Sequence, residues 1–270
     1  MAPLFLALVV LFAQATAFAQ KTQVVRIRNL TLVNLTQAPL PDYQQIVQFA
    51  LSGSAQDESL AAIPQRVRYA LQGRGYFRAE VSDPETTVVS QTPAEKVVDL
   101  VIRVNPGALY TLSNVEFDGD RAVEIFSADQ MRAQFPISPG DVFDTEKIRL
   151  GMEHLRKLFA DAGYINFTPV PETKVLEQSK SIVLTVDLDV GKRFYFGDLK
   201  IDGLSSNSDA AWTLNSDWTS LKGQPYSQTE LENFMQQHKR LLPPGFRPER
   251  NVEVRQDASS HTLTIELRLF

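Results

Sequence analysis

Cysteine is absent from this chain, and histidine occurs only three times. Without cysteine no disulfide can form, so the stability of the fold must come from packed cores. The three histidines are scattered, and the sequence holds neither a His-Glu-x-x-His metal motif nor a Gly-x-Ser-x-Gly nucleophile motif. They are His154, His238 and His261. We therefore expect no catalytic residue, no bound metal and no cofactor, and a protein that is not an enzyme.

Positive charge is also in short supply. The 27 lysines and arginines are outnumbered by 32 aspartates and glutamates, which leaves a net charge of −5 at pH 7. A general nucleic-acid binder needs a basic face, so this class is disfavoured. The remaining composition, 43% hydrophobic and 22% charged, is that of an ordinary globular protein.

Long apolar runs are missing after the N-terminus. Pro3 to Ala13 is almost wholly apolar, and Ala17-Phe18-Ala19 provides the small residues at −3 and −1 that signal peptidase requires. The run is shorter than the ~20 residues of a spanning helix and is interrupted by Gln14. The pattern predicts a signal peptide over residues 1–19, cleaved before Gln20, and a soluble mature chain outside the cytoplasm.

What the sequence does contain is a repeat. Leu109 to Gly119 returns as Arg193 to Gly203, both ending in Asp-Gly, at an offset of 84 positions (119 to 203). Two further pairs follow at offsets of 83 and 82, namely Gly140 with Gly223 and Gly163-Tyr164 with Gly245-Phe246. A nearly constant period indicates one small domain in tandem. It predicts domains over residues 20–108, 109–192 and 193–270, and such arrays usually bind or scaffold.

The order of elements is clearest in the second repeat. Alternation predicts a strand over Tyr110 to Phe117, and the 3.6-residue period of apolar side chains predicts a long helix over Thr145 to about Ala162. A short helix is expected between them, after the capping box that Ser127 begins. Two strands, Ile165 to Val170 and Ser181 to Val190, close the unit.

The other two repeats follow the same order. The third begins its long helix at Ser227 and ends in an alternating strand after a turn at residues 257–260. The first is less regular. We expect strands at Val24 to Leu30 and Val97 to Val104, helices at Tyr43 to Leu51 and Glu58 to Gln72, and a loop over Asp83 to Lys96.

This ordered set resembles the POTRA (polypeptide-transport-associated) domains of the outer-membrane β-barrel assembly factor family, here without the membrane barrel. The likeness rests on the aromatic-x-aliphatic strand ending in Asp-Gly, Gly-x-x-aromatic before the long helix, and Gly-aromatic after it. It covers about 109–270 well and 24–108 loosely. The resemblance implies an α+β fold of three small β-α-α-β-β domains, each a three-stranded mixed sheet covered by two helices. It also implies a periplasmic location, peripheral to the outer membrane rather than spanning it.

The same resemblance implies where binding would occur. An open sheet edge can accept an extended peptide as another strand, and in POTRA domains the middle strand in sequence order lies at an edge. The candidate edges are Phe77 to Val81, Ile165 to Val170 and Asn251 to Arg255. Within them the candidate binding residues are Phe77, Arg78, Ala79, Ile165, Asn166, Phe167, Asn251, Val252, Glu253, Val254 and Arg255. Pro169 and Pro171 would limit pairing in the second repeat.

The expected partners are unfolded outer-membrane polypeptides or a separate barrel or assembly protein. Two other interpretations stay open. One is a structural interaction module for envelope assembly or division, and the other is a truncated fragment of a barrel-containing assembly factor.

Overall fold

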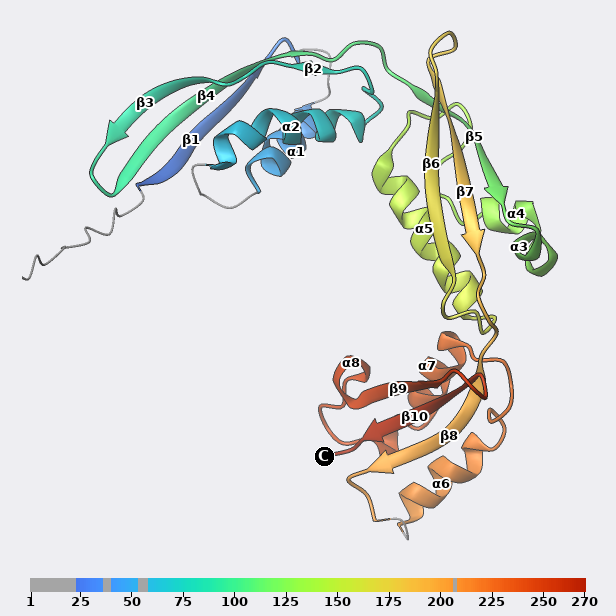
Figure 1. Ribbon diagram of the computed structural model, residues 1–270. Coiled ribbons are helices and arrows are strands. Elements are labelled where there is room, and N and C mark those ends of the chain that lie inside the picture. Colours follow the sequence, from blue (N-terminus) through green and yellow to red (C-terminus); the bar gives the residue numbers. More distant parts are fainter. Residues whose placement is uncertain (1–22, 36–39, 53–57, 206–207) are drawn as a thin grey trace, which may run out of the picture. The chain divides into compact units, whose positions relative to one another are not determined.

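The computed structural model describes residues 23–35, 40–52, 58–205 and 208–270. The predicted signal peptide lies outside these residues. Three mixed sheets follow one another along the chain, each accompanied by helices (Figure 1), which confirms the α+β tandem fold. We call each sheet with its helices a module. The backbone divides into two compact units, one with the first sheet and the other with Leu71–Ala79 and Pro106–Phe270.

The first module pairs β1 (Val24–Val33) in parallel with β4 (Glu95–Asn105). On its other side β4 pairs antiparallel with β2 (Glu80–Val81) and β3 (Glu85–Gln91), so these two short strands continue one edge. Helices α1 (Leu40–Leu51) and α2 (Glu58–Gln72) lie along the sheet (Figure 1). Fully buried side chains of both helices and of β4 form the core, among them Ile46, Val67, Val98, Leu100 and Ile102.

The expected loop over Asp83 to Lys96 is wrong, because β3 occupies half of it and β4 begins at Glu95. Every side chain of β3 is exposed, so the strand has no alternation of apolar and polar residues from which it could be predicted. Its threonines and valines favour extended backbone, and the ladder to β4 fixes it at the edge of the sheet.

The second module has the strand order β5-β7-β6. Its strands are β5 (Thr111–Asp118), β6 (Thr168–Leu176) and β7 (Ser181–Asp189), and its helices are α3 (Asp120–Ile125), α4 (Ala128–Arg132) and α5 (Thr145–Ala160). Helix α3 was not predicted, whereas the capping box of Ser127 and Gln130 at the start of α4 is confirmed. The Asp144 carboxylate accepts the first free amides of α5, those of Glu146 and Lys147.

The third module repeats this plan with the order β8-β10-β9. Its strands are β8 (Tyr195–Asp202), β9 (Val252–Asp257) and β10 (Thr262–Arg268), and its helices are α6 (Asp209–Trp218), α7 (Gln228–Gln237), the 3₁₀ turn η1 (Lys239–Leu241) and α8 (Pro248–Asn251). Trp218 of α6 packs edge to face against both Phe196 of β8 and Phe234 of α7. The Trp218 indole donates to the Gly197 carbonyl at 2.9 Å, so this buried donor is satisfied.

Two glycines fix how the chain enters the second and third sheets. The Gly75 carbonyl accepts from the Tyr110 amide at 2.9 Å, and the Gly163 carbonyl accepts from the Phe194 amide at 2.8 Å. Both glycines have positive φ, and a Cβ on them would lie 2.9 Å from the Tyr110 oxygen and 2.6 Å from the Phe194 oxygen. The Gly-aromatic motif therefore serves backbone geometry.

Candidate functional site

The sheet topology places β6 and β9, the middle strands of their modules in sequence order, at an edge of their sheets. Each pairs only with the last strand of its module. The boundaries predicted for the three domains stay predictions. The residues of the three candidate edge strands can be located in the structure one by one.

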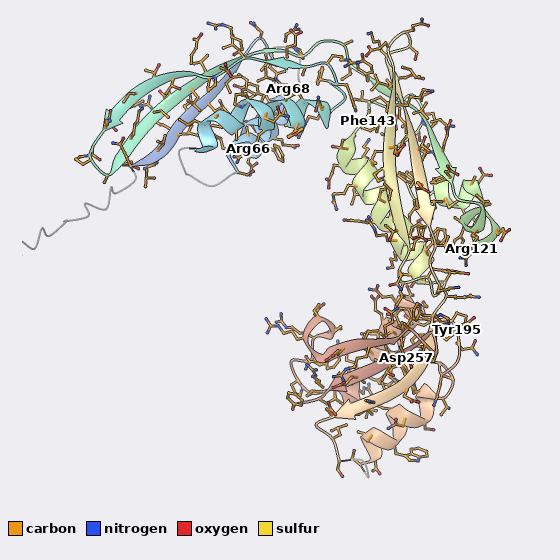
Figure 2. All side chains as sticks on the ribbon, viewed as in Figure 1. Arg66, Arg68, Arg121, Phe143, Tyr195 and Asp257 are labelled. Carbon is orange, nitrogen blue, oxygen red and sulfur yellow. The ribbon has the colours of Figure 1, made fainter. Side chains whose placement is uncertain are left out.

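In the first module the predicted edge is wrong at Phe77, Arg78 and Ala79. These residues form a turn after α2, and the strand that follows is β2, only two residues long. The Phe77 ring packs 5.2 Å from Phe143 (labelled in Figure 2) and joins the core of the second module. Arg78 forms an ion pair with Glu177. This segment therefore packs with the second module.

The prediction also fails at Ile165, Asn166 and Phe167, which precede β6. The Phe167 amide donates to the Tyr164 carbonyl at 3.1 Å, closing a turn, and its ring stacks 4.0 Å from Phe159 of α5. The Phe167 amide is used in this turn, so these residues lie before the edge strand and not on it. The edge strand begins at Thr168.

In the third module four predicted residues do lie on the edge strand. Val252, Glu253, Val254 and Arg255 belong to β9. Asn251 instead ends α8, where its side chain accepts from the Arg247 amide at 3.0 Å and donates to the Arg268 carbonyl at 2.8 Å. Asn251 therefore ties the start of β9 to β10.

The pairing of β9 with β10 determines which backbone groups of β9 point away from the sheet. Just beyond β10, the Leu269 amide donates to the Asp202 carbonyl at the end of β8. The backbone N–H and C=O of odd-numbered residues in β10 therefore point toward β8, and those of even-numbered residues point toward β9. The register pairs Glu266 with Glu253 and Thr264 with Arg255, which turns the amides of Glu253 and Arg255 inward. The outward backbone groups are those of Val252, Val254 and Gln256, but the Val252 amide already donates to the Pro248 carbonyl of α8, so the outward amides left for pairing are those of Val254 and Gln256.

The corresponding edge of the second module is blunted. By the same geometry, Thr168 and Val170 pair with the odd-numbered residues Asp189 and Asp187 of β7, so Pro169 and Pro171 face outward. Proline has no N–H, and an outward position is where an edge strand tolerates it. Two of the four outward donors of β6 are thus missing, and Thr173 and Val175 remain.

The other edges are also less open than β9. The segment before α5 pairs with β5, where the Leu112 amide donates to the Asp141 carbonyl at 2.8 Å, and the segment before α7 pairs with β8 in the same way through Phe196 and Gln224. In the first module β3 carries a bulge between Val88 and Ser90, which breaks a regular ladder. Strand β9 has a continuous register and no proline.

Charged side chains cover the face of the third sheet beside this edge. Arg255 pairs with Glu266 at 2.9 Å, and Arg268 pairs with Glu253. Glu266 is only 7% exposed, yet it is balanced by the guanidinium groups of Arg255 and Arg268. The hydrogen bond to Glu253, followed by the charges of Glu253 and Glu266, raises the pKa of Arg255. The alternation of residues 263–269 predicted a polar face here, but the strand pairing is needed to bring the four charges together.

The described residues form no group of three or more histidine, aspartate or glutamate side chains that could hold a metal ion. His238 is buried, with Nε2 2.8 Å from Asp217 of α6 and Nδ1 2.8 Å from the Phe234 carbonyl of α7. It thereby links two helices of the third module. None of the helices in the described ranges is both long and apolar enough to cross a membrane.

Comparison with known proteins identifies the repeated fold. The family model of POTRA, described as a surface antigen variable number repeat, matches residues 110–191, which is the second module. A crystal structure of Haemophilus influenzae BamA POTRA3-5 aligns with 93% of this chain and 98% of its own, with a TM-score of 0.57 and 16% identity. The chain has the fold of tandem POTRA domains.

A curated relative extends the comparison beyond the second POTRA module. The outer membrane protein assembly factor BamA of Buchnera aphidicola subsp. Acyrthosiphon pisum (strain APS) is 23% identical over 136 residues. The aligned part is 50% of this chain and 21% of that protein, so the chain spans about a fifth of its relative's length. The solved structure is only 16% identical to this chain, so its likeness to the three modules establishes the fold alone.

Proposed function

We propose that this chain is a periplasmic binding scaffold for the assembly of outer-membrane proteins, without catalysis. The POTRA fold and the likeness to a protein named as an outer membrane assembly factor support this assignment. The clients would be unfolded outer-membrane polypeptides or a separate barrel or assembly protein. The predicted signal peptide, in residues outside those the structure describes, supports export to the periplasm.

The open edge of β9 supports the mode of capture. An extended polypeptide would pair with the outward backbone groups of Val254 and Gln256 and lengthen the third sheet to four strands. Backbone pairing accepts many side-chain sequences, which suits a client that arrives unfolded. Among the edges described, β9 is favoured because it combines a continuous register with the absence of proline.

Proline substitution tests this proposal because it removes a single outward donor. Val254→Pro should weaken capture of an unfolded outer-membrane polypeptide by about tenfold, since it deletes a ladder bond and bars close approach. Thr173→Pro on β6 is the matched control. It also removes one outward donor, but from an edge that already carries two outward prolines and is not the proposed binding edge. Binding would be measured by site-specific photocrosslinking from position 256 and by fluorescence anisotropy. Circular dichroism would verify that both variants are folded.

The expected result is loss of crosslinking in Val254→Pro and retention in Thr173→Pro. Equal binding by parent and Val254→Pro would refute capture at β9. Recovery of neither barrel proteins nor assembly factors with the periplasmic chain would refute the wider assignment.

A further inference from the structure

The third module also carries a hollow, lined mainly by apolar side chains, that the edge strands do not use. It has a volume of about 490 Å³ and lies between α7 and the segment that leads to α8. Its lining residues include Met235, Leu242, Pro243, Pro244 and Phe246. This volume falls in the range of pockets that hold a ligand or a peptide side chain, ~300–1,000 Å³.

The hollow is held in shape before anything binds. Phe246 donates from its amide to the Pro243 carbonyl at 3.0 Å, and Arg247 donates to the Asn251 side chain at 3.0 Å. Asn251 in turn anchors this segment to β10 through the Arg268 carbonyl. Three prolines, Pro243, Pro244 and Pro248, restrict the backbone further. A preformed site loses little conformational entropy on binding.

Four exposed cations lie on the stretch of chain that lines this hollow or directly adjoins it, in a chain whose net charge is −5, and Lys239 is the one that lines the hollow itself. They are Lys239 and Arg240 on η1, Arg247 at the start of α8, and Arg250 within it. Within the described part of the chain none of the four has a carboxylate at ion-pair distance, unlike Arg149 or Arg255. Residues 239–250 contain one acidic residue, Glu249, so this segment carries a net charge of +3. Glu232 is the one carboxylate among the lining residues, and it accepts a hydrogen bond from Gln228.

We propose that this hollow docks a peptide segment of a partner protein that carries an apolar or aromatic anchor flanked by acidic residues. The anchor would fill the concave apolar surface, and the carboxylates would pair with Arg247, Arg250, Lys239 and Arg240. A flat anionic membrane could meet the cations but would leave the hollow unfilled. The concavity therefore favours a peptide. This site is separate from the β9 edge and requires no strand pairing.

A selection from random peptides tests the proposal while the partner itself is unidentified. The probe is a displayed library of random peptides of about 12 residues, selected on the whole mature chain. Enriched peptides should combine several aspartates or glutamates with a phenylalanine, tryptophan or leucine. A synthetic peptide of that composition should bind the parent. Its affinity should fall about tenfold in Arg247→Glu/Arg250→Glu, because two attractions become repulsions.

Three matched variants separate the possible causes. Pro244→Glu places a carboxylate at the apolar wall and should also abolish binding, whereas Arg156→Glu/Lys192→Glu makes the same change of net charge on the second module and should not. Val254→Pro blocks the β9 edge and should leave this binding intact, so failure here is distinguishable from failure of the proposed function. Folding of each variant would be checked by thermal melting.

Several results would overturn the proposal. These are an absence of enriched peptides, enrichment of basic or purely apolar peptides, and equal binding by Arg247→Glu/Arg250→Glu. Binding to vesicles with 30% phosphatidylglycerol, lost in that variant while acidic peptides fail to bind, would assign the cations to a lipid surface instead.

Discussion

Gly151 lies in the middle of α5, at a position where helix propensity favours alanine over glycine by about 1 kcal/mol. A Cβ there would sit 2.2 Å from the Phe135 ring, which packs against the helix. We expect Gly151→Ala to destabilise the chain by roughly 1–3 kcal/mol, because the overpacking outweighs the gain in propensity. Urea unfolding measures this. In a Phe135→Leu background the same substitution should cost less, and equal costs in both backgrounds would contradict the explanation.

Single residues also mark the limit of what the sequence could predict. The helix caps Ser127 and Asp144 could be recognised in the sequence, because each bonds to amides only two or three residues further along the chain. Phe77 and Phe167 were assigned to edge strands, but tertiary packing places them against Phe143 and Phe159. Nothing local distinguishes an aromatic that begins a strand from one that fills a core.

At the scale of elements, the turn between β6 and β7 holds the segment that follows α2. Glu177 in this turn accepts from the Tyr110 hydroxyl at 2.6 Å and pairs with Arg78. These partners, Tyr110 first, lower the pKa of Glu177 from 4.5 to about 2. A lowered pKa in the folded state contributes stability above pH 4.5 that is lost as the pH falls toward 2.

Glu177→Gln should therefore lower the melting temperature at pH 7, and the difference from the parent should vanish near pH 2. The effect should be small and should shrink in salt, since the Glu177 side chain is 47% exposed. Melting curves from pH 2 to pH 7 at two salt concentrations measure it. Glu172→Gln on β6 is the control. Parallel pH profiles for parent and Glu177→Gln would show that Glu177 contributes nothing.

Element order was largely predictable, whereas the condition of each edge was not. Each of β10 and α5 buries one face, so apolar residues alternate with polar ones along β10 and recur about every 3.6 residues along α5. The free edge of β9 depends on which amides turn outward, which only the pairing with β10 decides. Pro169 and Pro171 could be read as limiting an edge from sequence, because proline lacks a donor in any context. The cations beside the hollow, Lys239, Arg240, Arg247 and Arg250, come from two segments joined by the turn at residues 243–246, which no local pattern predicted.

At the scale of the whole molecule, a repeat of one fold also repeats how each module is entered. The amide of Tyr110 donates to the carbonyl of Gly75, and the amide of Phe194 donates to the carbonyl of Gly163 in the same way. What differs is the bond to the following helix. The Thr145 amide donates to the Gly73 carbonyl, whereas the Thr229 amide donates to the Asp161 carboxylate at 3.0 Å. Asp161 thus caps a helix of the next module with a side chain, and a side chain can be removed by mutation.

Asp161→Ala should loosen the third module from the second. Its carboxylate also accepts from the Thr229 hydroxyl at 2.9 Å and from the Ser227 hydroxyl at 3.2 Å, so three bonds to the start of α7 are lost together. A lost helix cap costs about 0.5–2 kcal/mol. Because the chain has no cysteine, Arg156→Cys and Gln236→Cys can carry a unique pair of spin labels. The distance distribution between α5 and α7 should broaden in Asp161→Ala and stay unchanged in Asp187→Ala. A distribution as narrow as the parent's would mean that the Gly163–Phe194 bond and the packing of Ile165 against the third core suffice to hold the two modules.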